Sequence, residues 1–309
     1  MRQSALQEVY QLAKKDKRVV FIGSDLGHGT LTQMKEELPN QFFMEGISEQ
    51  HLIGFAAGLA KQGFIPFVNT IATFFTRRAN EQIAIDLALH QSHVILLASG
   101  GGMVYAPLGP THTAIEDIAT MSAIPGIRIA CPADPLEMKE IVQTTIKEVG
   151  PWYVRFGKGG ESTITDKSTK RMDHLKFFGD IDSPIIILTT GITLHAAIEF
   201  RSSNIRLAEK TCVVHVPILY NHYLETLVKQ LHNARKVIVL EEHIPTGGLF
   251  TRLLHLANKF GIDARNFHQR SLPFGYSQHY GSQKEHLDHN GLNGKGVLQS
   301  LENFIWGIH

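Results

Sequence analysis

The sequence predicts an α/β protein made of two parallel-sheet α/β domains, and two observations carry that prediction. Short runs of β-branched and apolar residues alternate with helical patterns, which is typical of a parallel sheet covered by helices. A polar stretch from Gly157 to Asp182, rich in Gly, Ser, Thr and Lys, interrupts this alternation. We therefore expect a first domain over residues 1–160, a linker over 161–182 and a smaller second domain over 183–309.

The first domain should hold buried strands joined by helices. We expect strands at Arg18–Gly23, Phe64–Thr70, His93–Ser99, Ile127–Ala133 and Tyr153–Phe156. We expect helices at Glu49–Lys61, Phe75–His90, Ile115–Met121 and Pro135–Val149. Ser48 is a suitable N-cap for the first of these helices and Gly63 a suitable stop. Asp134 should cap the last, with proline in its first turn.

The second domain repeats the alternation. Its expected elements are, in order, strand Pro184–Thr190, helix Thr193–Arg201, strand Thr211–Val216, helix Tyr223–Asn233, strand Lys236–Glu241 and helix Gly248–Phe260. A turn-rich tail then becomes helical from about Gly296. The two cysteines, Cys131 and Cys212, lie far apart and suggest no disulfide framework or metal cluster, so we expect both to be buried strand residues.

Composition excludes several classes of function. Hydrophobic residues make up 43% of the 309 residues and charged residues 19%, which fits a globular protein with a sizeable core. A formal net charge of +1 gives no field that favours nucleic acid or an acidic membrane. The N-terminal stretch lacks the apolar core of a secretory signal, and no apolar run approaches the roughly 20 residues that cross a bilayer. We expect a cytoplasmic protein.

The fold class also predicts where the chemistry lies, because ligands of open parallel sheets bind beyond the carboxyl ends of the strands. The loops selected in this way are 24–30, 45–50, 71–75, 100–113 and 157–160, with 241–248 in the second domain. Glu49 lies in one of them, at the start of a helix rich in small apolar residues. An acid there can simply complement the helix dipole, but a carboxylate beside a deeply packed helix needs a specific partner.

Several motifs together resemble the transketolase family. They are G-I-S-E-Q-H at 46–51, A-A-G-L-A at 56–60, an aromatic pair after a strand, G-P-T-H at 109–112, C-P-A-D at 131–134 and E-E-H-I-P-T-G-G at 241–248. The resemblance covers about Arg18 to Gln299. Over this range the chain is similar to that family's pyrimidine-binding domain followed by its C-terminal domain. Deoxyxylulose-phosphate synthases and beta subunits of 2-oxo-acid dehydrogenases share this architecture.

In that family the glutamate that matches Glu49 bonds the aminopyrimidine ring of thiamine diphosphate. Sharing a proton with the ring nitrogen favours the imino tautomer of the exocyclic amine, which then removes the thiazolium proton; a partly buried acid suits this role. The resemblance therefore implies thiamine diphosphate as cofactor and ketol transfer as reaction.

The resemblance assigns further cofactor and substrate roles. Phe75 falls where the family stacks an aromatic on the pyrimidine, with Phe74 as the alternative if the register shifts by one, and both can instead be core residues. His112 in G-P-T-H matches a histidine that faces the reacting carbons and bonds substrate hydroxyls. Asp25 matches an acid near the cofactor at the subunit interface, although an Asx turn explains it equally well.

Two basic residues match positions that reach substrate phosphate in relatives. Arg78 falls where related synthases carry an arginine and transketolases a tyrosine. Lys158, in a glycine-rich loop, falls where relatives often carry a basic residue. For both, a solvated surface side chain is the alternative.

The chain departs from the family pattern in what it lacks. In the family a Gly-Asp-Gly motif and a downstream asparagine hold Mg²⁺ and the diphosphate; no Gly-Asp-Gly occurs in this sequence, and Mg²⁺ needs oxygen ligands in near-octahedral geometry. We expect a separate N-terminal transketolase-like subunit to supply that site, with no metal held by this chain. Two copies of each subunit would make a heterotetramer.

The loop before His112 departs as well. Gly100 and Gly101 stand where transketolases have a histidine–aspartate pair, and Leu108 stands where they have an acid. Leu108 and Tyr105 should make this side of the substrate pocket less polar. We expect a substrate other than the usual pentose phosphates, such as a modified, deoxy or nucleotide-linked sugar or another 2-oxo compound.

Two other functions remain open at this point. The chain could be the beta-type subunit of a 2-oxo-acid decarboxylating or deoxyxylulose-phosphate-synthase-like enzyme. It could also be a non-catalytic scaffold partner, against which the joint presence of Glu49, Phe75 and His112 argues.

Overall fold

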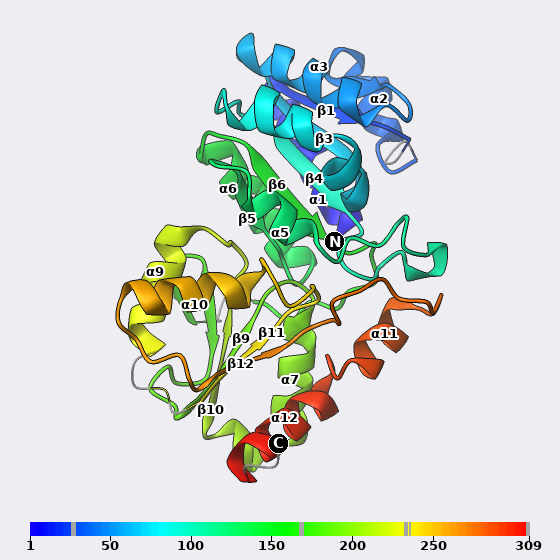
Figure 1. Ribbon diagram of the computed structural model, residues 1–309. Coiled ribbons are helices and arrows are strands. Elements are labelled where there is room, and N and C mark those ends of the chain that lie inside the picture. Colours follow the sequence, from blue (N-terminus) through cyan, green and yellow to red (C-terminus); the bar gives the residue numbers. More distant parts are fainter. Residues whose placement is uncertain (26–28, 167–169, 232–233, 235, 307–309) are drawn as a thin grey trace.

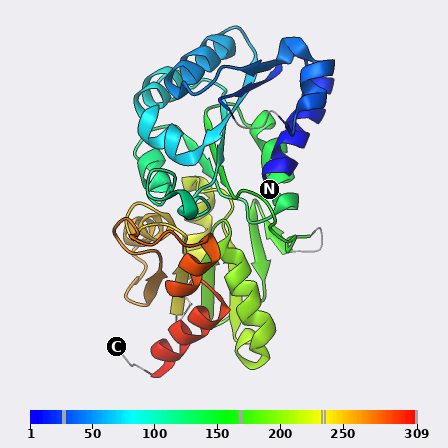
Figure 2. The same ribbon diagram turned by 90° about the vertical axis from the view of Figure 1, so that its right-hand side faces the viewer.

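The computed structural model describes residues 1–25, 29–166, 170–231, 234 and 236–306, which form two six-stranded sheets. Figure 1 shows the sheet of the N-terminal half above that of the C-terminal half. Seen from the side in Figure 2, helices cover both faces of the upper sheet. Two parallel-dominated α/β sheets confirm the predicted fold class.

The first sheet is entirely parallel, with strand order β2-β1-β3-β4-β6-β5. Its strands are β1 Val19–Gly23, β2 Phe42–Met44, β3 Ile65–Ile71, β4 Ile95–Ser99, β5 Arg128–Ala130 and β6 Trp152–Phe156. Each strand expected from the hydrophobic runs is present. The three-residue edge strand β2 was not predicted, because so short a run carries no periodicity.

Helices and turns connect these strands. They are α1 Arg2–Lys15, α2 Thr32–Glu37, η1 Pro39–Gln41, α3 Glu49–Lys61, η2 Phe74–Arg78, α4 Asn80–Gln82, η3 Ile83–Ala88, η4 Ala106–Leu108, α5 Asp117–Ser122 and α6 Pro135–Lys147. Asp134 caps α6 by accepting hydrogen bonds from the two amides at Leu136 and Glu137. Ser48 precedes α3 as expected but does not cap it, because its hydroxyl donates to the carbonyl of Glu45 instead.

The expected helix over 75–90 is interrupted. Residues Phe74–Arg78 and Ile83–Ala88 are π-helical, with only the short α4 between them. A π-helical turn takes in more residues than an α-turn and therefore changes which side chains share a face. This difference decides which aromatic residue faces the candidate site.

The second sheet has the order β12-β11-β9-β10-β8-β7. Its strands are β7 Lys170–Met172, β8 Leu175–Phe178, β9 Ile185–Thr189, β10 Thr211–His215, β11 Lys236–Leu240 and β12 Phe267–Arg270. The first two are antiparallel and lie inside the stretch expected to be a linker, which corrects that expectation for residues 170–178. Their charged residues hid the strand pattern: Lys176 is 2% exposed because acidic side chains of α6 neutralise it.

The helices of this half are α7 Thr193–Ser203, α8 Ile205–Ala208, α9 Asn221–Gln230, α10 Leu249–Lys259, α11 Gln283–His289 and α12 Gly294–Trp306. Helix α11 was not predicted, although Ser282 and Glu285 form a capping box at its start. No helix in the described part of the chain is both long and apolar enough to cross a lipid bilayer.

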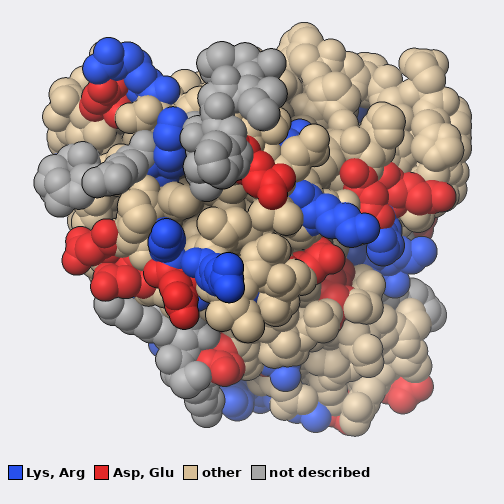
Figure 3. All heavy atoms as spheres, turned by 90° about the horizontal axis from the view of Figure 1, so that it is seen from below, with Lys and Arg blue, Asp and Glu red and all other residues tan. Residues whose placement is uncertain are grey.

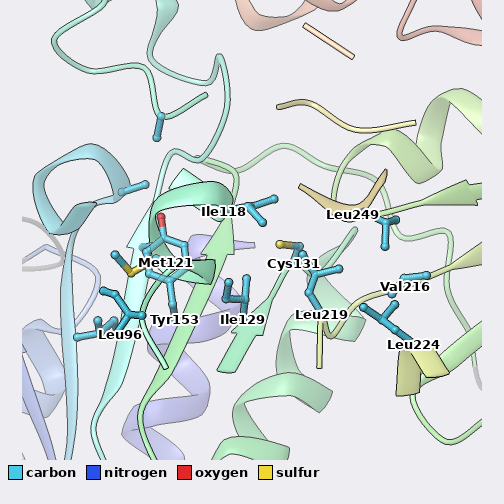
Figure 4. Close-up of a cluster of buried hydrophobic side chains, with 14 of the residues drawn as sticks. Leu96, Ile118, Met121, Ile129, Cys131, Tyr153, Val216, Leu219, Leu224 and Leu249 are labelled. Atoms are coloured by element: carbon cyan, nitrogen blue, oxygen red, sulfur yellow. The ribbon is translucent and has the colours of Figure 1, made fainter. Parts of the chain in front are cut away.

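The two halves share one hydrophobic core. Figure 4 shows Ile118 and Cys131 of the first half beside Leu219 and Leu249 of the second, all within one buried cluster. The backbone continues the contact, because the Cys131 amide donates to the carbonyl of Pro217 at 2.7 Å. Cys131 directly follows β5 and Cys212 lies in β10, and both are free and buried.

A buried ion cluster also joins the halves. Glu137 of α6 lies 2.8 Å from the Lys176 ammonium and 2.9 Å from His215 Nε2, and all three side chains are at most 3% exposed. Burial alone would raise the pKa of Glu137, but the charges and hydrogen bonds of His215 and Lys176 outweigh it and lower the pKa to about 2. The exposed charges seen from below in Figure 3 are, by contrast, basic and acidic side chains intermixed.

We predict that Glu137→Gln destabilises the fold by about 3 kcal/mol at pH 7, because it leaves Lys176 buried without its closest counter-ion. The pKa of Glu137 is depressed from 4.5, so its stabilising contribution is complete above about pH 4.5 and is lost as the pH falls towards 2. Urea unfolding at pH 7, 4 and 3 should show this slope in the wild type and a weaker one in the variant. Glu225→Gln, which breaks an exposed pair with Lys259, is the control and should change the unfolding midpoint little. Equal destabilisation by both variants would contradict the prediction.

Candidate functional site

The candidate site lies at the carboxyl edge of the first sheet. Because β1, β3, β4 and β6 run parallel, the segments that follow them meet at this edge. The segment after β1 brings Ser24 and Asp25, the segment after β3 is η2, and the segment after β4 is the loop 100–113. Residues 26–28 of the first segment lie outside the described part of the chain.

Glu49, the first residue of α3, is the buried acid of the site, with 1% of its surface exposed. Thr70 Oγ1, at the end of β3, donates to Glu49 Oε1 at 3.0 Å, and Arg78 Nη1 donates to Oε2 at 2.5 Å. The helix N-terminus and Arg78 together compensate for burying this negative charge. The Arg78 side chain is 42% exposed. One carboxylate oxygen is thus held by the strand, and the other by a side chain that reaches solvent.

Phe74, and not Phe75, is the aromatic residue that faces the site. Its ring lies edge-on to the His112 ring with centroids 5.4 Å apart, and the Arg78 guanidinium lies 4.2 Å from its centroid. Phe75 is 0% exposed and belongs to the hydrophobic core with residues of α3 such as Leu52. These contacts favour Phe74, the alternative register, over Phe75 for the stacking position, and the π-helical turn at η2 places the two rings in this way.

His112 is presented by a loop that is closed at its base. Gly102 and Ala114 form an antiparallel bridge, donating to each other's carbonyls at 2.8 and 3.0 Å. The His112 amide donates to the carbonyl of Gly109, and its Nδ1 lies 2.8 Å from Thr111 Oγ1. Within the described residues, no hydrogen bond engages Nε2. That nitrogen is available to a bound molecule.

The glycines at the start of this loop make room for three large side chains. A Cβ at Gly100 would lie 2.0 Å from the Tyr105 ring, and one at Gly101 would lie 2.3 Å from Arg155 Cγ. A Cβ at Gly102 would lie 2.2 Å from the carboxyl carbon of Glu242. The Tyr105 ring therefore occupies the space that a side chain at position 100 would need.

The remaining predicted residues make no hydrogen bond or ion pair with Glu49 in the described part of the chain. Leu108, in η4, is 54% exposed, and Asp25 is exposed and accepts from Ser24 Oγ at 3.0 Å. Lys158 is exposed on the loop after β6, and no hydrogen bond or ion pair of the described residues joins it to Glu49, Arg78 or His112. The structure thus brings together Glu49, Phe74, Arg78 and His112, while Lys158 lies exposed on the separate loop after β6.

Sequence reasoning missed several residues that support the site. Thr70 was expected only as the end of a strand, yet it orients Glu49. Arg155, 5% exposed, donates from Nε to Asp117 Oδ2 and from Nη2 to the Glu242 carbonyl, both at 2.8 Å. Burial lowers the pKa of Arg155, but Asp117 and Glu242 outweigh it and raise the pKa above its ordinary value. These partners are far apart in the sequence, so no local pattern indicates them.

The E-E-H-I-P-T-G-G segment forms the expected strand-to-helix turn between β11 and α10. Glu241 accepts from the amides of Leu249 and Phe250 and so caps α10. A Cβ at Gly247 would lie 2.3 Å from Ala119 Cβ, which shows why glycine is needed for this close packing. Glu241 and His243 are both buried.

Comparison with known proteins gives related subunits and enzymes. The chain is 29% identical to a protein of Phocaeicola vulgatus that is named as a subunit of apulose-4-phosphate transketolase, over 98% of this chain and 97% of that protein. It is 28% identical to "1-deoxy-D-xylulose-5-phosphate synthase" of Desulfotalea psychrophila over 97% of this chain, but spans only 47% of that synthase.

Solved structures show the same fold. One described as "Split gene transketolase, inactive beta4 tetramer" superposes with a TM-score of 0.83 at 25% identity, covering 98% of this chain and 96% of that one. The transketolase of Campylobacter jejuni superposes with a TM-score of 0.78 at 18% identity, covering 99% of this chain and 46% of that one.

The family itself is established by a sequence model. The model described as "Transketolase, pyrimidine binding domain" matches residues 1–160, more than half of the chain. The C-terminal half carries a second sheet of the kind found in the solved relatives. The chain belongs to the transketolase family of thiamine-diphosphate-dependent enzymes and corresponds to its C-terminal half.

Proposed function

We propose that this chain is the C-terminal subunit of a split transketolase, which transfers a two-carbon ketol unit from a ketose to an aldose. The observation that carries the proposal is the grouping of the buried Glu49 carboxylate with Phe74 and His112 at one sheet edge. The Phocaeicola vulgatus relative, itself named as one subunit of a transketolase, matches this chain from end to end, which supports a subunit of the same kind.

The residues at this edge fit the aminopyrimidine ring of thiamine diphosphate. Glu49 would bond the ring nitrogen through Oε2, with Thr70 keeping Oε1 in place, and Phe74 would face the ring. Arg78 now holds Oε2 and would have to yield it. When bound, the cofactor supplies the nucleophilic carbon that accepts the ketol unit. Asp25 would lie near it at the subunit interface.

The loop 100–113 and η2 would bind the sugar. His112 Nε2 would donate to or accept from substrate hydroxyls, while Leu108 and Tyr105 would form a wall of the pocket. Arg78, once released from Glu49, would be free to bind the substrate phosphate, as would Lys158.

An N-terminal partner subunit would complete the enzyme by supplying the site for Mg²⁺ and the diphosphate. Two findings support this: the sequence has no Gly-Asp-Gly motif, and the Phocaeicola vulgatus relative, matched over 97% of its length, is itself named as one subunit of a transketolase. We infer a heterotetramer with two copies of each subunit.

Glu49→Gln should lower ketol transfer by the reconstituted pair by about 100-fold or more, because an amide keeps the shape but cannot share a proton with the ring. Release of the aldose product from a ketose phosphate measures the effect. Glu81→Gln is the matched control, since Glu81 is an exposed first-turn acid of α4. Unchanged turnover in Glu49→Gln would favour the non-catalytic scaffold.

Calorimetric titration should show weak binding of thiamine diphosphate and Mg²⁺ to this chain alone and tight binding to the chain with its partner. The physical reason is that this chain offers the ring side of the site and the partner the diphosphate side. Tight binding to the isolated chain would contradict the proposal that this chain provides only the ring side of the cofactor site.

The glycines at the start of the loop carry a proposal about the sugar. With Gly100 and Gly101 in place of a histidine–aspartate pair, the space is filled by Tyr105 and Arg155 instead of groups that bond sugar hydroxyls. We infer a donor that is a modified, deoxy or nucleotide-linked sugar or another 2-oxo compound, and apulose 4-phosphate, which the name of the Phocaeicola vulgatus relative contains, is one to test.

We predict that the reconstituted pair has a kcat/KM for xylulose 5-phosphate with ribose 5-phosphate at least about 10-fold below that for its preferred donor, because the polar groups that would bond the usual hydroxyls are missing. A panel of ketose phosphates, including apulose 4-phosphate, measures this. Efficient turnover of the two pentose phosphates would refute it. Consumption of pyruvate without ketose cleavage would identify the 2-oxo-acid or synthase alternative.

A further inference from the structure

Arg77 is the residue that ties η2 to the loop carrying His112. Its Nη1 donates to the carbonyl of Pro110 at 2.8 Å and its Nη2 to the carbonyl of Thr113 at 3.0 Å. The same guanidinium pairs with Glu116, Nε donating to Oε1 at 2.6 Å. Two of these bonds end on carbonyls on either side of His112. The guanidinium therefore fixes the loop backbone on both sides of His112.

The C-terminal half reaches the same guanidinium. The segment that follows β12 runs beside the loop 100–113 at the right of Figure 1, and Arg77 lies 5.4 Å from the centre of the Tyr276 ring. Further along, the Tyr280 ring lies so close to Gly109 that a Cβ there would be 2.5 Å from Tyr280 Cε1. Both tyrosines are more than half exposed. The His112 loop is thus held from two sides, by η2 and by the second half.

We propose that Arg77 is a positioning residue that holds His112 against Phe74, and that Tyr276 extends this hold to the second half. The inference rests on the proposed function. A lysine could not replace it, since one ammonium group cannot present a planar fork of donors to two carbonyls and a carboxylate at once. Arg77 touches neither Glu49 nor Phe74 through any hydrogen bond or ion pair of the described residues, so it acts through the loop.

The first test is Arg77→Lys in the reconstituted pair, which keeps the charge. We expect kcat to fall by about 10- to 100-fold, the cost of a small misplacement of a substrate-contacting group, with cofactor affinity unchanged. Tyr276→Leu should give a smaller loss in the same direction. Arg265→Lys is the matched control, because among the described residues Arg265 pairs with the exposed Asp263 of the second half, and it should leave kcat unchanged.

The decisive measurement is a double-mutant cycle with His112→Ala. If Arg77 acts through His112, then Arg77→Lys should cost little in the His112→Ala background. The same fold loss in both backgrounds would overturn the proposal, because it would show that Arg77 acts independently of His112.

A readout without activity separates this inference from the proposed function. The imidazole NMR signals of His112 in the isolated chain should shift and broaden in Arg77→Lys but not in Arg265→Lys, with the unfolding midpoint reporting that both variants fold. Unshifted His112 signals in a folded Arg77→Lys variant would overturn the positioning role. If the reconstituted pair shows no ketol transfer while the signals shift, the proposed function fails and the positioning role stands.

Discussion

The buried guanidinium of Arg155 is the constraint on which the arrangement of the two halves depends. A cation that is 5% exposed must find partners, and Arg155 finds one in each half: the Asp117 carboxylate of α5 and the carbonyl of Glu242 after β11. Gly101 lies directly against this side chain, so the loop 100–113 starts from a rigid base. Arg155 therefore fixes the start of the loop, while Arg77 holds the segment on either side of His112.

The site follows from parallel strands and one irregular helix. Parallel pairing brings Thr70 and the His112 loop to one edge, where Glu49 begins α3. The π-helical turn at η2 then directs Phe74 towards His112 and Arg78 towards Glu49, and leaves Phe75 in the core. The second half supports the loop through Tyr276 and Tyr280. The acids of E-E-H-I-P-T-G-G are buried with backbone partners: Glu241 accepts from the amides of Leu249 and Phe250, and Glu242 accepts from the amide of Met103.

Prediction from sequence succeeded where a pattern involves neighbouring residues and failed where burial depends on residues far away in the sequence. The strands at β1, β3, β4 and β9–β11 are continuous apolar runs, so their burial is visible locally. Strands β7 and β8 were missed because Lys176 is buried only through Glu137 and Glu140, which come from a different half of the chain. Likewise, a helix was expected over 75–90 because composition does not distinguish α-helical from π-helical turns.

The sequence by itself determined the fold class, the family and the candidates Glu49 and His112, because those depend on hydrophobic periodicity and on motifs of adjacent residues. Only the tertiary structure decided that Phe74 faces the site, that Thr70 orients Glu49 and that Arg77 holds the His112 loop. Each of these depends on contacts between residues 21 to 36 positions apart or on a turn whose form is set by packing. Such contacts arise only when the strands have paired and the two halves have closed on a common core.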